Sequence, residues 1–66
     1  MAGNTRGRLK ERFEGIHKNF DWIQEHCNQS LILIGDKSPQ VKTAVTSLYE
    51  AVTTLDKLAQ DIYAKL

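Results

Sequence analysis

The 66 residues carry nine lysines and arginines against eight aspartates and glutamates, so the net charge of +1 excludes a strong overall field. A chain of this length forms one domain at most, and such a domain buries only about 60% of the surface that its unfolded form exposes. The single cysteine excludes an internal disulfide and favours a reducing compartment, so oligomerisation is the expected additional source of stability.

The first predicted helix spans residues 8–34 and follows a flexible basic N-terminus, residues 1–7, in which glycine occurs twice. Within this helix, mostly apolar side chains recur in alternating steps of four and three residues. This heptad spacing is typical of a helix that packs along one stripe, which we name the seam. The seam positions of the first helix are Leu9, Phe13, Ile16, Phe20, Ile23, Cys27, Ser30 and Ile34.

Two residues of the first helix depart from an ideal pattern. Ser30 is the polar member of the seam, and we expect its hydroxyl to bond a carbonyl one turn back. The alternative is a polar residue that sets the register of the helices. Gly15 costs the helix about 1 kcal/mol relative to alanine, and it is either a tolerated defect or a point of close approach for another chain.

A loop of residues 35–38 is predicted to separate the two helices. Gly35 suits the position after a helix end, where a left-handed backbone is common, and Ser38 suits an N-cap. Pro39 suits the first helical position because its missing N–H would have no partner there. The second helix is predicted over residues 39–66. Its seam positions are Val41, Val45, Leu48, Val52, Leu55, Ala59, Ile62 and Leu66.

The two seams are mirror images of each other about the loop. Positions whose numbers sum to 75 pair every seam residue of one helix with a seam residue of the other. An antiparallel hairpin needs this relation, whereas a parallel coiled coil does not. We therefore predict an all-α fold, an antiparallel two-helix hairpin of the coiled-coil type, with helices about 45 Å long at about 1.5 Å per residue.

Further apolar residues lie outside the two seams. Those of the second helix widen its apolar stripe to three residues per heptad, which is more than one partner helix covers. We expect two hairpins to bury them as a homodimeric four-helix bundle, and the alternative is that they bind a different protein. These predicted interface residues are Trp22, Leu31, Leu33, Ala44, Ala51 and Leu58.

No residue set in the sequence matches a catalytic, cofactor or metal site. His17 and His26 are nine positions apart and do not share a helical face at the spacing of two metal ligands. Cys27 lies in the seam, where a free cysteine behaves as a small apolar residue. We therefore predict a protein that is not an enzyme, with no catalytic residues, metal ligands, cofactor or small-molecule substrate.

For the aromatic residues outside the seams, a structural role is the favoured explanation and recognition of a partner is the alternative. Trp22 is expected to add bulk at a helix interface, or to anchor a separate partner. Tyr49 and Tyr63 lie two heptads apart with Asp56 between them, and this row is expected to form a polar rim on the outside of the hairpin.

Basic side chains are concentrated at the N-terminal end of the first helix. The helix dipole disfavours positive charge at this position, so these residues do not stabilise the helix and are candidates for another role. In the hairpin, Lys65 is expected to lie near the same end. The candidate nucleic-acid contacts are Arg6, Arg8, Lys10, Arg12 and Lys65.

The longest apolar run covers only residues 31–34, far below the ~20 residues that a membrane-spanning helix needs. The first residues also lack the apolar core of a secretory signal. We therefore expect a cytoplasmic, or more generally intracellular, protein with no membrane contact.

Two functions stay open on the sequence alone. The first is a small interaction and oligomerisation module that binds itself and binds or regulates another protein. The second is a small regulator that binds RNA or DNA through the basic N-terminal end. The pattern of apolar residues favours the first.

Overall fold

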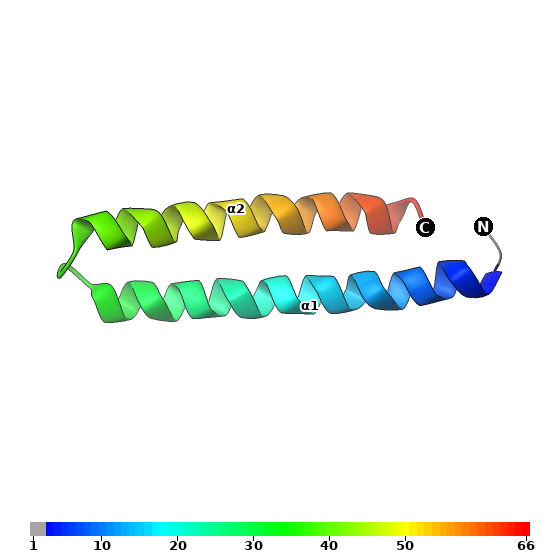
Figure 1. Cartoon of the computed structure of the whole chain (residues 1–66), viewed down its shortest axis with the longest axis horizontal. Coiled ribbons are helices and arrows are strands. Elements are labelled where there is room, and N and C mark those ends of the chain that lie inside the picture. Colours follow the sequence, from blue (N-terminus) through cyan, green and yellow to red (C-terminus); the bar gives the residue numbers. More distant parts are fainter. Residues whose placement is uncertain (1–2) are drawn as a thin grey trace.

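The computed structural model of the chain describes residues 3–66. Two α-helices, α1 (Gly3–Ile34) and α2 (Pro39–Ala64), run antiparallel and side by side (Figure 1). The described residues contain no strand, and neither of their two helices is long and apolar enough to cross a membrane. The principal extents are 53 × 15 × 11 Å, so the hairpin is a rod. The predicted all-α fold, with two helices packed against each other, is confirmed.

The loop of residues 35–38 is organised by its local sequence. Gly35 follows the end of α1 with a φ of 51°, a left-handed conformation that glycine adopts without strain. Its amide donates to the Leu31 carbonyl at 3.0 Å, which closes the last turn. Ser38 has an extended backbone and accepts a hydrogen bond from the Val41 amide at 3.4 Å, so it is the N-cap of α2.

The beginning of α1 differs from the sequence prediction. A flexible tail is expected over residues 1–7, but α1 begins at Gly3, so residues 3–7 are helical. Met1 and Ala2 lie outside the described residues. The beginning of α1 and the end of α2 lie at the same end of the rod, where the first turns of α1 extend past α2 (Figure 1). At the other terminus, α2 ends at Ala64 and Lys65 caps it.

The core between the two helices is small. Among the described residues, the buried apolar side chains are Cys27, Val52 and Ala59, and the buried charged side chain is Asp56. No large side chain in this part of the chain is completely buried. Ser30 donates to the His26 carbonyl at 2.8 Å, as predicted, so its hydroxyl is satisfied within α1.

The face of α2 that meets α1 differs from the predicted seam. Four apolar residues that the heptad spacing places in the seam keep between 39% and 53% of their surface exposed. They are Val41, Leu48, Leu55 and Ile62. The expected polar rim turns toward α1 instead. Tyr49 is half-buried, Asp56 is buried, and Tyr63 hydrogen-bonds to α1.

The predicted register is nevertheless retained. Side-chain hydrogen bonds across the two helices join His17 with Asp56, Gln24 with Thr53 and Glu14 with Tyr63. The residue numbers of these pairs sum to 73 or 77, on either side of the predicted 75. Relative to the predicted seams, α2 is therefore rotated about its own axis without a shift along it. α1 is turned in the same sense, because Ile23 of its predicted seam is 40% exposed whereas Gln24 and Leu31 are half-buried. A single partner helix covers only one side of the wide apolar stripe of α2, so the other side stays in water.

Replacing each of two glycines by alanine should change the free energy of unfolding in opposite directions. An added Cβ at Gly15 meets no described atom within 4 Å, so Gly15→Ala should raise the free energy of unfolding by about 1 kcal/mol through helix propensity alone. Gly35→Ala should lower it by about 1–2 kcal/mol, because alanine is strained at positive φ. Urea unfolding followed by circular dichroism measures both. A destabilised Gly15→Ala would show that another chain approaches α1 closely at that point.

Candidate functional site on the two edges of the hairpin

One edge of the contact between α1 and α2 is held by side-chain hydrogen bonds. The Tyr63 hydroxyl donates to the Glu14 carboxylate at 3.0 Å. About three turns further along the rod, the Gln24 amide donates to the Thr53 hydroxyl at 2.8 Å. His17 and Asp56 meet between these two pairs. We name the row formed by these residues the polar edge.

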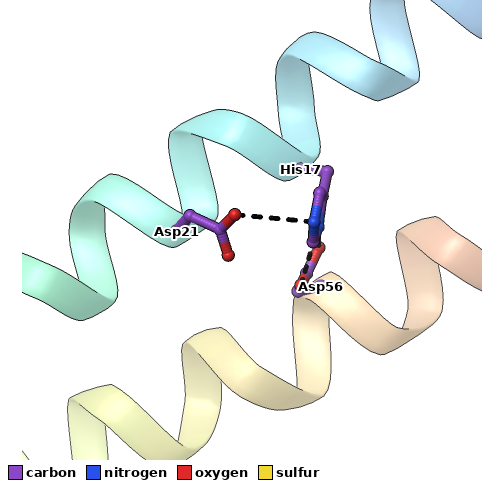
Figure 2. A group of neighbouring side chains, drawn as sticks. All are labelled: His17, Asp21 and Asp56. Atoms are coloured by element: carbon purple, nitrogen blue, oxygen red, sulfur yellow. Dashed lines mark hydrogen bonds and ion pairs between the residues drawn. The ribbon is translucent and has the colours of Figure 1, made fainter.

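His17 lies at the centre of the polar edge, between two carboxylates (Figure 2). Its Nδ1 is 2.8 and 3.0 Å from the two oxygens of Asp56 on α2, and its Nε2 is 3.5 Å from Oδ2 of Asp21, one turn further along α1. The side chains of His17 and Asp21 are 45% and 57% exposed, whereas that of Asp56 is only 10% exposed.

The buried carboxylate of Asp56 has all the partners that its burial requires. Besides His17, it accepts a hydrogen bond from the Gln60 amide at 3.1 Å. A buried carboxylate without such partners would be strongly unfavourable. None of the buried side-chain nitrogen or oxygen atoms in the described residues lacks a hydrogen-bond partner. The cluster is therefore a satisfied polar network within the contact of two helices.

The polar edge changes the titration of two side chains. The hydrogen bond to Asp56 raises the pKa of His17 above its ordinary 6.5; partial desolvation opposes this, and the negative charges of Asp21 and Asp56 reinforce it. The hydrogen bond to Glu14, together with its charge, raises the pKa of Tyr63 in the same way.

The opposite edge of the helix contact is apolar. Ile16 immediately precedes His17 in α1, and Leu55 immediately precedes Asp56 in α2. Consecutive residues of an α-helix point about 100° apart, so each apolar residue lies across the contact from its polar neighbour. The helices are antiparallel, and His17 and Asp56 meet on one edge of the contact. Ile16 and Leu55, which precede them in the chain, therefore both lie on the opposite edge.

We name this second surface the apolar face. Its α2 row repeats in steps of three and four residues from Val41 to Ile62, a length of about 32 Å at about 1.5 Å per residue. All its residues are exposed except Ile16, which is half-buried. The members of the apolar face are Ile16, Ile23, Val41, Ala44, Leu48, Ala51, Leu55, Leu58 and Ile62.

The structure separates the six predicted interface residues into three groups. Ala44, Ala51 and Leu58 belong to the apolar face. Trp22 and Leu33 are 71% and 77% exposed, on the side of α1 that points away from α2. The Trp22 ring is tilted against that of His26, with the ring centroids 6.5 Å apart.

The sixth residue, Leu31, is placed differently from the prediction. It is half-buried and follows the buried Cys27 by one helical turn, so it lies on the row of α1 that faces α2. Leu31 therefore contributes to the hairpin itself and is not on the outer surface where the heptad spacing places it.

The basic residues do not form one patch. Arg6 and Lys10 are one turn apart on one side of α1, and Arg8 and Arg12 lie on nearly the opposite side. Lys65 follows α2 at the same end of the rod. All five are exposed except Lys10, which is half-buried. Their positive charge is thus divided around the end of the hairpin.

The cluster of His17, Asp21 and Asp56 is not predicted by the sequence. The spacing of His17 and Asp21, four residues apart in a predicted helix, is a visible signal. Asp56 gives no such signal, because its approach to His17 depends on the rotation of α2.

Comparison of the chain with protein-family models, with curated proteins and with solved structures finds no match. The features from which a function can be inferred are therefore those of the chain itself. They are the apolar face, the polar edge and the exposed Trp22.

The polar edge makes the stability of the hairpin dependent on pH. Because the pKa of His17 is raised on folding, its interaction with Asp56 stabilises the fold fully below the unfolded-state pKa of about 6.5. This stabilisation is lost as the pH rises through the folded-state pKa. Urea unfolding across this pH range should show a decreasing free energy of unfolding, and NMR titration of the His17 ring should give a pKa above 6.5.

The matched variant is Asp56→Asn, which keeps an acceptor for the ring but removes its charge. The His17 pKa should fall in this variant. A His17 pKa that is the same in the native chain and in Asp56→Asn would contradict the assignment of Asp56 as the main cause.

Proposed function

We propose that this chain is a self-associating helical interaction module, in which two hairpins join their apolar faces as a homodimeric four-helix bundle. The observation that supports this proposal is the continuous exposed row of apolar residues along α2. Its leucines at 48, 55 and 58 are each at least 50% exposed. Complete burial of a leucine side chain contributes about 1.5–3 kcal/mol relative to its exposure, so covering the row is strongly favourable.

The total exposed area supports a partner of similar size. The chain exposes 5278 Å², whereas a compact monomer of its mass would expose about 4,200 Å². The excess is about 1,000 Å² per chain. A stable protein–protein interface buries about 800 Å² per partner. The excess surface of the whole chain is therefore comparable with the area that one partner buries in a stable dimer interface.

The spacing within the apolar face fits packing against other helices. Steps of three and four residues are the heptad spacing that lets side chains of one helix fit between those of another. Ala44 and Ala51 lie one heptad apart and allow the backbone of a partner to approach closely. In a two-fold symmetric dimer the same face serves both chains, so one self-complementary surface is sufficient.

A second protein would be bound on the outside of the bundle. Trp22 remains outside the proposed dimer interface, and tryptophan is enriched among the residues that carry binding energy in interfaces. Asp21, Glu25 and His26 line the same shallow groove as Trp22. The groove would suit a partner that presents an apolar side chain next to basic residues. The divided basic end of α1 gives no comparable single surface for nucleic acid.

The mass of the chain in solution tests the proposed dimer. Sedimentation equilibrium should give twice the mass of one chain for the native protein, at low and at moderate salt. Ala51→Arg places a charge within the apolar face, so it should reduce the mass to that of one chain.

The matched control is Thr46→Arg, which adds the same side chain to α2 at an exposed position one heptad before Thr53, on the polar edge. It should keep the dimer. Circular dichroism verifies that both variants remain helical. A monomeric native chain, or an Ala51→Arg variant with the mass of the native protein, would refute the proposed bundle.

A further inference from the structure

The polar edge holds three side chains with the donor atoms of a metal site. His17, Asp21 and Asp56 each offer one nitrogen or carboxylate oxygen, and these atoms lie within 4.8 Å of one another. Figure 2 shows the two carboxylates on different sides of the imidazole ring, one from each helix. The self-association proposed above uses none of these atoms.

We propose that this cluster binds a divalent transition-metal ion such as Zn²⁺, with His17 Nε2 and Asp21 as direct ligands and Asp56 as the residue that orients the ring. One ion cannot bind both ring nitrogens of the same imidazole, because their lone pairs diverge. Since Nδ1 faces Asp56, the nitrogen available to an ion is Nε2, on the side of Asp21.

The distance between the two direct ligands fits such an ion. Nε2 of His17 and Oδ2 of Asp21 are 3.5 Å apart. Zinc lies about 2.0–2.2 Å from imidazole nitrogen and carboxylate oxygen. An ion about 2.1 Å from both atoms therefore sees them at an angle of about 110°, close to the tetrahedral value that zinc prefers. The spacing of four residues keeps both ligands on one side of α1.

Asp56 completes the arrangement from the second helix. A histidine that binds a metal usually donates its other ring N–H to a carboxylate, which fixes the tautomer and the orientation of the ring. Asp56 accepts from Nδ1 with both of its oxygens, and Gln60 donates to one of them at 3.1 Å. With Nδ1 carrying the proton, Nε2 is the ring nitrogen with a free lone pair, and it lies 3.5 Å from Oδ2 of Asp21.

The chemistry of these donors selects the class of ion. One imidazole nitrogen and one carboxylate oxygen suit zinc and its neighbours among the transition metals better than magnesium or calcium, which prefer oxygen ligands alone. Two protein ligands leave the remaining positions to water, so the site is open to solvent on the exposed side of His17 and Asp21.

Calorimetric titration of the whole chain with Zn²⁺ tests the site, in a buffer that does not bind metal and at a pH above the His17 pKa. We expect one ion per chain. His17→Gln and Asp21→Asn should each weaken binding at least about ten-fold, and Asp56→Asn should weaken it by about 10–100-fold as an orienting residue does. In the NMR spectrum, Zn²⁺ should shift the ring signals of His17.

The matched controls are His26→Gln and Asp61→Asn, two exposed positions outside the cluster, and both should bind Zn²⁺ like the native chain. Asp21 makes no hydrogen bond to α2 among the described contacts and is 57% exposed, so its variant stays folded even if the His17 variant does not. Absence of Zn²⁺ binding at millimolar concentration, or equal losses in the His17 and His26 variants, would overturn the proposal.

The site can be tested separately from self-association. The metal cluster is on the polar edge, across the helix contact from the apolar face. Monomeric Ala51→Arg should therefore bind Zn²⁺ with the affinity of the native chain. A native chain that is monomeric but binds Zn²⁺ would support the metal site without the bundle, and a native dimer that binds no Zn²⁺ would support the bundle without the metal site.

Discussion

The hydrogen bond between His17 and Asp56 is the interaction on which the rest of the hairpin depends. The Asp56 side chain is only 10% exposed, so its carboxylate must have hydrogen-bond partners. It faces α1, where His17 is such a partner. This orientation fixes the rotation of α2 about its axis. Leu55, next to Asp56 in the chain, is then forced to the other side of the contact. One polar interaction thus produces both the polar edge and the apolar face.

This rotation leaves the hairpin with little apolar burial of its own. Cys27, Val52 and Ala59 are its buried apolar side chains among the described residues. Small domains with so little core normally gain stability from a metal, a disulfide or a second subunit. The proposed bundle and the proposed metal site are two such sources, and they lie on opposite edges. In an association of this kind, stability depends on protein concentration, because the folded chain and its partner form together.

The loop and the register of the two helices can be predicted from the sequence, but the rotation of α2 about its own axis cannot. Gly35 and Ser38 mark the loop because a left-handed residue and an N-cap each depend on only a few neighbouring residues. The mirror relation of the two heptad patterns gives the register. The rotation of α2 cannot be predicted in this way, because the spacing of apolar residues places all the seam residues between the two helices. The hydrogen bond between Asp56 and His17, which are 39 residues apart in the chain, cannot be predicted from the spacing of residues. The same long-range approach hides the metal cluster.

The burial of Cys27 gives the hairpin an internal reporter of its own motion. Its thiol is the only one in the chain, and the residue is 5% exposed, between the two helices. An alkylating reagent can reach it only when α1 and α2 separate. The rate of alkylation is therefore governed by the fraction of molecules that are open at any moment, and it measures the free energy of opening about two helical turns from the loop. Ligands that hold the helices together would slow this reaction without touching the sulfur.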